Sequence, residues 1–180
     1  MKASLLVIGL AVAGFMNHPM TARAWPRTAW LWSPAVFQDY SQLYGYIARS
    51  RGLGDAADAD LTRRLATHST VERLRNLEDC SAAPIIVVRA DLLDRDGTSR
   101  LRSADGSFPL YVLRETPQGL LLLGRMSGMR YRAKFLSRGL EFTVEQHRPG
   151  NKDVQARFRI EGDTLIDLSA ARERFQDAIA

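Results

Sequence analysis

Three consecutive segments between residues 130 and 160 alternate apolar and polar side chains, and this alternation constrains the fold more than any other feature of the chain. The apolar positions are Tyr131, Ala133 and Phe135, then Leu140, Phe142 and Val144, then Val154, Ala156, Phe158 and Ile160. A period of two is typical of β-strands with one buried and one solvated face. Because the connections between the segments are short, we expect neighbouring antiparallel strands.

The polar positions of these segments predict the register of the sheet. They are basic in the first segment, acidic in the second and basic in the third. A two-residue turn at Arg138-Gly139 and a longer loop at Arg148 to Asp153 would bring opposite charges together. The expected pairs are Phe135 with Phe142, Arg132 with Glu145, and Glu141 with Arg159. Opposite charges paired across strands contribute roughly 0.2–1 kcal/mol each, which favours this register over a slip by one residue.

Further apolar runs extend the sheet. Together with the three alternating segments they predict six strands, at about 108–115, 119–126, 129–136, 140–147, 154–161 and 164–168. Ile85–Val88 is β-branched and lacks polar alternation, which indicates a strand covered on both faces. The run Leu120–Leu123 also needs apolar cover on both faces. The candidates are the first helix, described next, and the tryptophan segment, Trp25–Trp32, which holds all three tryptophans of the chain.

Helical patterns precede the strands. Ser33 can cap a first helix, Pro34 suits its first position and Gly52 can end it. The apolar stripe of that helix is Val36, Tyr40, Leu43 and Ile47, widened by Phe37, Tyr44 and Ala48. A second region, Asp58–Asp79, changes phase near His68-Ser69. Ser69 and Glu72 have capping-box spacing there, so we expect two short helices.

A final short helix is predicted at Ser169–Ile179. The fold class is therefore α+β: N-terminal helices packed on a twisted antiparallel meander of about six strands, with a short C-terminal helix. We expect one domain over residues 25–180, helical over 33–79 and mainly β over 84–168.

The first 24 residues predict export. Lys2 is followed by an uncharged apolar run, Ala3–Met16, and Ala22-Arg23-Ala24 has the small-x-small pattern of a signal-peptidase site. The run has 14 residues, whereas a membrane span needs roughly 20, so a cleaved signal peptide is favoured over an anchor. The mature protein would begin at Trp25 and work outside the cytoplasm, in the periplasm or secreted, without a stable membrane span.

Charge gives little support for nucleic-acid binding. The formal net charge of the chain is +5, and loss of Lys2 and Arg23 leaves 23 basic against 20 acidic residues, or +3. The charges are mixed along the chain, with no basic arm and no stacking motif of a known nucleic-acid module. A solvated surface explains this distribution.

Catalytic and metal-binding motifs are weak. Cys80 is the only cysteine, and it follows two acidic residues that disfavour a thiolate. Cys80 and His147 are the least poor candidates for catalysis, and a buried inert thiol is the simpler interpretation. Asp91, Asp94 and Asp96 do not fit an EF-hand loop, which leaves a turn or an irregular calcium loop. We expect no cofactor and no metal.

One carboxylate pair can be discarded as a glycosidase site. Glu141 and Glu145 are four residues apart on one predicted strand, roughly 13 Å at about 3.3 Å per residue. This exceeds the roughly 6.5–9.5 Å of inverting glycosidases.

Aromatic and basic residues are the better candidates, and they point to binding. Trp30, Trp32 and Tyr46 could anchor a protein partner or a glycan, although they could equally cover the leucine-rich end of the sheet. Arg130, Arg132 and Arg159 could hold an anion, although nearby glutamates would neutralise much of their field. The leading hypothesis is an exported, non-enzymatic binding or accessory protein whose partner is another cell-envelope protein. The alternatives are a hydrolase of an envelope polymer that uses scattered residues, and a carrier that holds a small ligand on the inner face of the sheet.

Overall fold

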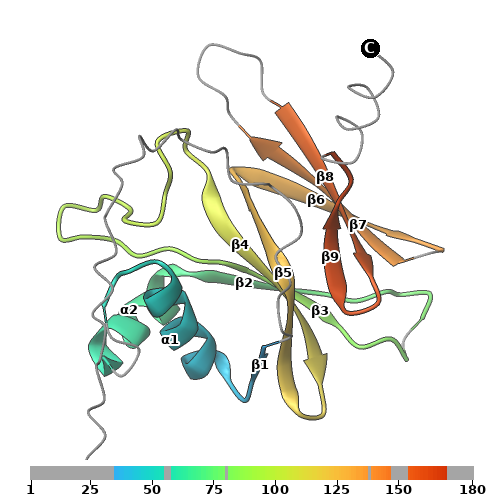
Figure 1. Cartoon of the computed structure of the whole chain (residues 1–180), viewed down its shortest axis with the longest axis horizontal. Coiled ribbons are helices and arrows are strands. Elements are labelled where there is room, and N and C mark those ends of the chain that lie inside the picture. Colours follow the sequence, from blue (N-terminus) through green and yellow to red (C-terminus); the bar gives the residue numbers. More distant parts are fainter. Residues whose placement is uncertain (1–34, 55–57, 80, 138, 147–153, 170–180) are drawn as a thin grey trace, which may run out of the picture. The chain divides into compact units, whose positions relative to one another are not determined.

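Two antiparallel sheets and two helices make up the regular structure of the residues that the computed structural model describes: 35–54, 58–79, 81–137, 139–146 and 154–169. All of them belong to one unit, Trp32–Ala180. The helices are α1 (Tyr40–Ser50) and α2 (Ala59–His68). The first sheet, in the order β1-β5-β4-β3-β2, contains β1 (Val36–Phe37), β2 (Thr70–Leu74), β3 (Ile85–Arg89), β4 (Phe108–Thr116) and β5 (Gly119–Gly128). The second, in the order β6-β7-β8-β9, contains β6 (Arg130–Leu136), β7 (Gly139–Gln146), β8 (Val154–Glu161) and β9 (Thr164–Asp167) (Figure 1).

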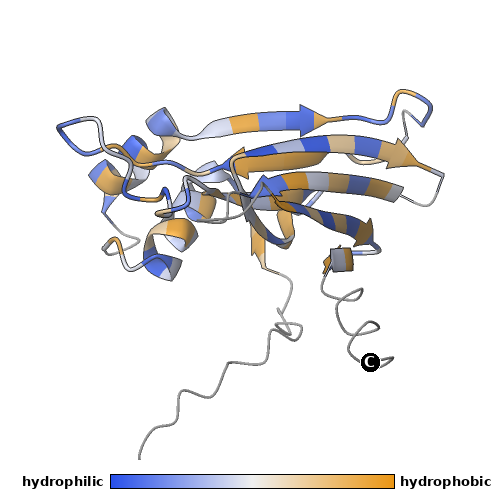
Figure 2. Ribbon diagram, turned by 90° about the horizontal axis from the view of Figure 1, so that it is seen from above, coloured by the Kyte–Doolittle hydropathy of each residue, from blue (hydrophilic) through white to orange (hydrophobic). Residues whose placement is uncertain are grey.

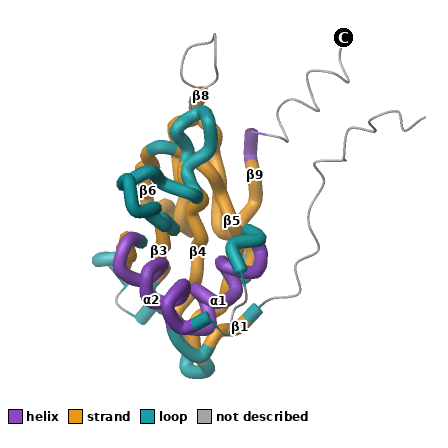
Figure 3. Tube along the Cα trace, turned by 90° about the vertical axis from the view of Figure 1, so that its left-hand side faces the viewer, coloured by secondary structure: helices purple, strands orange, loops and turns teal. Residues whose placement is uncertain are grey.

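The first sheet is covered on both faces, so the chain forms three layers. One face packs against α1 and α2 in a cluster that includes Leu43, Ile47, Leu65, Ile86, Val88, Tyr111, Leu113, Leu120 and Leu122. The other face packs against the second sheet in a cluster that includes Ile85, Val87, Leu110, Val112, Leu121, Leu123, Phe142, Val144 and Phe158. All four residues of Ile85–Val88 are buried, as their unbroken apolar pattern predicts. The helices and strands of the layers are distinguished in Figure 3.

The six predicted strands correspond to β4–β9, and each pair of adjacent strands within the two described sheets is antiparallel. The prediction that they form one meander is wrong, because the chain passes from the first sheet to the second at Gly128-Met129. The physical reason is the apolar second face of β5: Leu121 and Leu123 require cover, and the second sheet supplies it. At the crossing, a Cβ on Gly128 would lie 2.2 Å from Cγ1 of Val144, so glycine permits the sheets to approach there.

The faces of the second sheet follow the sequence pattern, which appears as alternating bands along the strands in Figure 2. Phe142 is fully buried and Glu141 lies on the outer face. Glu141 pairs with Arg159, as expected. Between β6 and β7 the register differs from the prediction by two residues, so that Arg130 rather than Arg132 lies opposite Glu145 and Ala133 rather than Phe135 lies opposite Phe142.

The cause of this difference is the position of the turn. Leu136 pairs with Gly139, so Gly139 is the first residue of β7 rather than part of the turn, where the sequence pattern predicts it. A shift by two residues keeps every side chain on its predicted face, because the side-chain period of a strand is also two.

The first helix begins later than its sequence predicts. Val36 and Phe37 form β1, which pairs with Leu121 and Leu120 of β5. Asp39 then caps α1, accepting a hydrogen bond of 2.9 Å from the N–H of Gln42. The predicted end is confirmed: α1 stops at Ser50, just before Gly52, whose φ is +62°.

The second helical region contains one helix, not two. The break at His68-Ser69 is confirmed, but Thr70–Leu74 is strand β2, paired with β3. Ser69 does not begin a helix. Its hydroxyl accepts a hydrogen bond of 3.1 Å from the N–H of Asp91. Pairing with the buried strand β3 outweighs the local capping-box pattern.

Several predicted segments lie outside the described residues: the signal peptide (1–24), the tryptophan segment up to residue 32, the predicted start of the first helix at 33–34, and the C-terminal helix apart from its first residue. Within the described part of the chain, neither helix has the length and apolar character needed to cross a bilayer.

Candidate interaction surface

Strand β6 is one of the two edge strands of the second sheet, with β7 as its only strand partner among the described residues. The edge strands of the two described sheets have two, five, seven and four residues for β1, β2, β6 and β9 respectively, so β6 is the longest. The outer edge of such a strand carries backbone N–H and C=O groups that can pair with another chain. Strand β6 is therefore the edge strand with the longest run of backbone groups among the described sheets.

The inner face of β6 is only partly covered. Tyr131, near its start, packs edge-on against buried Phe142 with 5.9 Å between the ring centroids. Farther along the same face, Ala133 is exposed and Phe135 retains 36% of its accessible surface. The apolar alternation of β6 therefore continues beyond the part of the sheet that is buried.

The hydroxyl of Tyr131 connects β6 to the first sheet. It donates a hydrogen bond to the carboxylate of Glu72 on β2. Burial, together with this carboxylate, raises the pKa of the Tyr131 hydroxyl above its ordinary value. The phenol therefore stays protonated as a donor, and the start of β6 is held in place.

The outer face of β6 carries three exposed cations: Arg130, Arg132 and Lys134. None of them forms an ion pair with a residue in the described ranges. Their partners in register on β7 are Glu145, Thr143 and Glu141. Basic side chains thus line the surface beside a strand edge that pairs with no other described strand, and apolar side chains lie on the opposite face.

Arg159, which the sequence groups with Arg130 and Arg132, is placed differently. Its Nη2 lies 3.1 Å from Glu141, and its Nη1 lies 3.8 Å from Glu161. The same Glu141 carboxylate accepts a hydrogen bond of 3.0 Å from Nε of Arg157. These two guanidinium groups hold the pKa of Glu141 below its usual value. Arg159 therefore belongs to an internal charge network on β7 and β8, not to the free basic surface.

Tyr46 does not join this surface. It lies on α1, partly buried against the helix-side core, which is the apolar cluster between the first sheet and the two helices. Its ring centroid is 5.3 Å from that of Phe37. Burial raises the pKa of its hydroxyl. Trp30, Trp32, Cys80 and His147 lie outside the described residues, so the structure neither joins them to Tyr46 nor tests their proposed roles.

The aspartate-rich loop after β3 uses its carboxylates internally. Asp91 accepts hydrogen bonds from the N–H of Leu92 and the hydroxyl of Ser99. Asp96 accepts one of 2.9 Å from the N–H of Thr98. Across the described ranges there is no cluster of three or more histidine, cysteine or acidic side chains able to hold a metal ion.

The inner face of the second sheet, which a ligand carrier would need, is occupied by protein. Phe142 and Val144 are fully buried and pack in one cluster with residues of β3, β4 and β5. Their side chains contact the first sheet, so this part of the face is not available to a ligand in the described conformation.

No family model, curated protein or solved structure matches this chain. The candidate surface therefore rests on its own geometry. Sequence reasoning identified Arg130 and Arg132 but missed Ala133, Lys134 and Phe135. The signal for these three was present in the alternation, but the sequence did not show that the strand carrying them is an edge.

Proposed function

We propose that this chain is an exported, non-enzymatic binding or accessory protein that interacts with another cell-envelope protein through strand β6. The observation that carries the proposal is a combination of three features of β6: an edge without a strand partner among the described residues, exposed apolar residues on one face, and three cations on the other face that form no ion pair with a described residue. Addition of an extended segment to such an edge gives main-chain hydrogen bonds for affinity and side-chain contacts for specificity.

The charges indicate the chemistry of the added segment. Two copies of β6 paired edge to edge would place cations opposite cations, which is destabilising. On the outer face β6 is basic, β7 is acidic and β8 is basic. An acidic strand added beside β6 would therefore extend this alternation of basic and acidic strands. The partner is therefore expected to present a strand with acidic residues at alternate positions and apolar residues between them.

Export is supported by the sequence pattern of residues 1–24 and places the interaction in the periplasm or outside the cell. N-terminal sequencing of the protein recovered from the exported fraction should begin at Trp25. Recovery of the uncleaved chain from the cytoplasm alone would remove the envelope partner from the proposal.

Site-specific photo-crosslinking in intact cells tests the proposed surface. A photoreactive amino acid replacing exposed Ala133 on β6 should form a discrete adduct with one envelope protein. The same replacement at exposed Ala66 on α2 is the matched control and should not. The double change Arg132→Glu, Lys134→Glu should abolish the adduct while leaving the thermal midpoint of unfolding within a few degrees. Equal adducts from both positions, or an adduct insensitive to charge reversal, would contradict binding through β6.

A further inference from the structure

Two arginine side chains converge on one aromatic ring near the crossing between the sheets. The guanidinium carbon of Arg89 lies 3.9 Å from the centroid of the Phe108 ring, and that of Arg102 lies 5.5 Å from it. Arg89 is the last residue of β3 and Arg102 lies in the loop before β4, whereas Phe108 begins β4. Neither guanidinium forms an ion pair with any residue that the structure describes.

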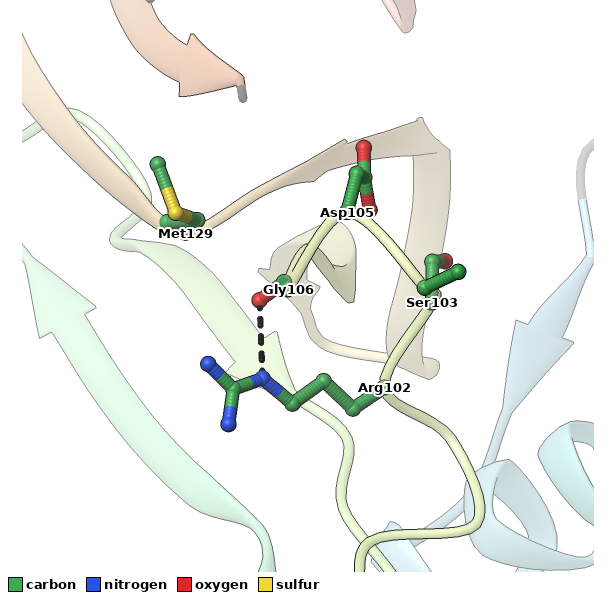
Figure 4. A pocket seen from close by; sticks show the side chains of 6 residues that line it. Arg102, Ser103, Asp105, Gly106 and Met129 are labelled. Carbon is green, nitrogen blue, oxygen red and sulfur yellow. Dashed lines mark hydrogen bonds between the residues drawn. The ribbon is translucent and has the colours of Figure 1, made fainter. Parts of the chain in front are cut away.

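Arg102 also lines an open pocket of about 480 Å³, together with residues 103–106 and Met129. Its Nε donates a hydrogen bond of 3.2 Å to the carbonyl of Gly106, which leaves the terminal guanidinium nitrogens for another acceptor (Figure 4). A Cβ on Gly106 would lie 3.2 Å from one of these nitrogens, so glycine gives the guanidinium room to lie against the loop.

The acidic side chains nearest in sequence are already engaged. Asp105 accepts hydrogen bonds of 3.0 Å from both the N–H and the hydroxyl of Ser107. Figure 4 shows its carboxylate directed away from the Arg102 guanidinium. Asp91 is bonded within its own loop, as described above. The two guanidinium groups thus border the same ring, and neither has a carboxylate partner among the described residues.

We propose that Arg89, Arg102 and the loop of residues 103–106 bind an oxyanion of the phosphate type. A guanidinium group recognises phosphate through paired N–H donors. The two positive charges of two arginines balance the two negative charges of a phosphate, whereas a carboxylate would balance only one of them. The stacked Phe108 ring fixes the position of Arg89 by cation–π attraction and limits the entropy lost on binding. Met129, which lines this pocket, directly precedes β6, so the pocket adjoins the start of that strand. Binding of an oxyanion there does not depend on the proposed protein partner.

The test is a titration of the mature protein with inorganic phosphate at constant ionic strength, followed by backbone amide NMR shifts. Saturable shifts are expected at Ala104, Asp105 and Gly106, and sodium chloride at the same ionic strength should not produce them. Arg102→Gln and Arg89→Gln should each weaken phosphate binding at least tenfold. Arg89→Gln breaks no hydrogen bond within the described structure, so it tests the site without disturbing the loop.

Arg75→Gln is the matched control, because it removes one exposed cation in the loop after β2 and should change phosphate binding less than twofold. Equal weakening by all three changes would show diffuse electrostatics rather than a site and would overturn the proposal. The absence of saturable shifts would overturn it as well.

A second arm distinguishes a free phosphate from a phosphate carried by a lipid. Vesicles of phosphatidylcholine with and without phosphatidic acid are mixed with the protein and floated. Flotation only with phosphatidic acid, reversed by inorganic phosphate and lost in Arg102→Gln, supports a lipid-borne phosphate at this site. Phosphate binding without flotation supports a free phosphate compound. Flotation that Arg102→Gln leaves unchanged places the lipid contact elsewhere and removes lipid as the source.

Discussion

Single residues decide where charge is neutralised and where it remains available. Glu141 binds two guanidinium groups from β8 and keeps one of them, Arg159, half-buried. On β6, the other neighbour of β7, the cations Arg132 and Lys134 could form the same kind of ion pair, but neither does so with a described residue. The difference arises because β7 has a strand on each side and β6 has only one. The same residue type is therefore structural on β8 and available for binding on β6.

The Glu141 network predicts a pH-dependent contribution to stability. The folded-state pKa of Glu141 is lowered from an ordinary value of 4.5. The carboxylate therefore stabilises the fold fully above pH 4.5, and this contribution is lost as the pH falls through the lowered pKa. Glu141→Gln should reduce the free energy of unfolding by about 1 kcal/mol at pH 7. The difference from wild type should be smaller at pH 3, because protonation of the wild-type carboxylate below pH 4.5 weakens the network.

Urea denaturation at the two pH values checks this expectation. Glu145→Gln is the control, because it removes a carboxylate from the same face of the same strand that has no recorded ion pair in the described structure. It should change the free energy of unfolding by less than about 0.5 kcal/mol. A Glu141→Gln deficit that persists unchanged at pH 3 would assign the loss to packing instead of charge.

At the scale of elements, the period of the apolar pattern predicts where the later strands lie, but it does not predict which strands pair when they are far apart in the chain. All strands from β4 to β9 were predicted close to their bounds, because alternation and turn residues are local signals. Strand β2 was predicted as a helix, and the two residues of β1 were assigned to α1. Both depend on a partner strand far away in the chain, which no local pattern encodes.

Strand β1 allows a direct test of this tertiary pairing with two adjacent residues. Phe37 is buried in the helix-side core and Val36 is 47% exposed, although both pair with β5. Phe37→Ala should lower the free energy of unfolding by about 3 kcal/mol through cavity formation. Val36→Ala should lower it by less than about 0.5 kcal/mol. Chemical denaturation of the two variants measures this contrast, and similar values for both would mean that β1 is not docked as described.

The candidate surface shows the same division between local and long-range information. Alternation placed Arg130 and Arg132 on an outer face, and the structure agrees. Their availability follows from the order of strands in the second sheet, which depends on where the chain crosses at Gly128. The sequence could not distinguish a six-stranded sheet, in which β6 is flanked on both sides, from two sheets, in which it is an edge.

At the scale of the whole molecule, the two sheets share one core. Phe142 of β7 packs in the same cluster as Val87 of β3 and Leu110 of β4, and all three are almost completely buried. Neither sheet can therefore lose its inner contacts without exposing apolar surface of the other. This mutual dependence predicts that the sheets unfold as one cooperative unit.

Native-state hydrogen exchange on Phe142→Ala tests this cooperativity. The substitution should cost about 3–5 kcal/mol, because it removes a large, fully buried side chain. If the sheets form one unit, the exchange free energies of slow amides in β3 and in β7 should fall by the same amount, since both exchange only by global opening. Thr143→Ala, on the outer face next to Phe142, should leave both nearly unchanged. Faster exchange in β7 with β3 unaffected would mean that the second sheet opens independently, and that the edge of β6 is presented by a separately unfolding element.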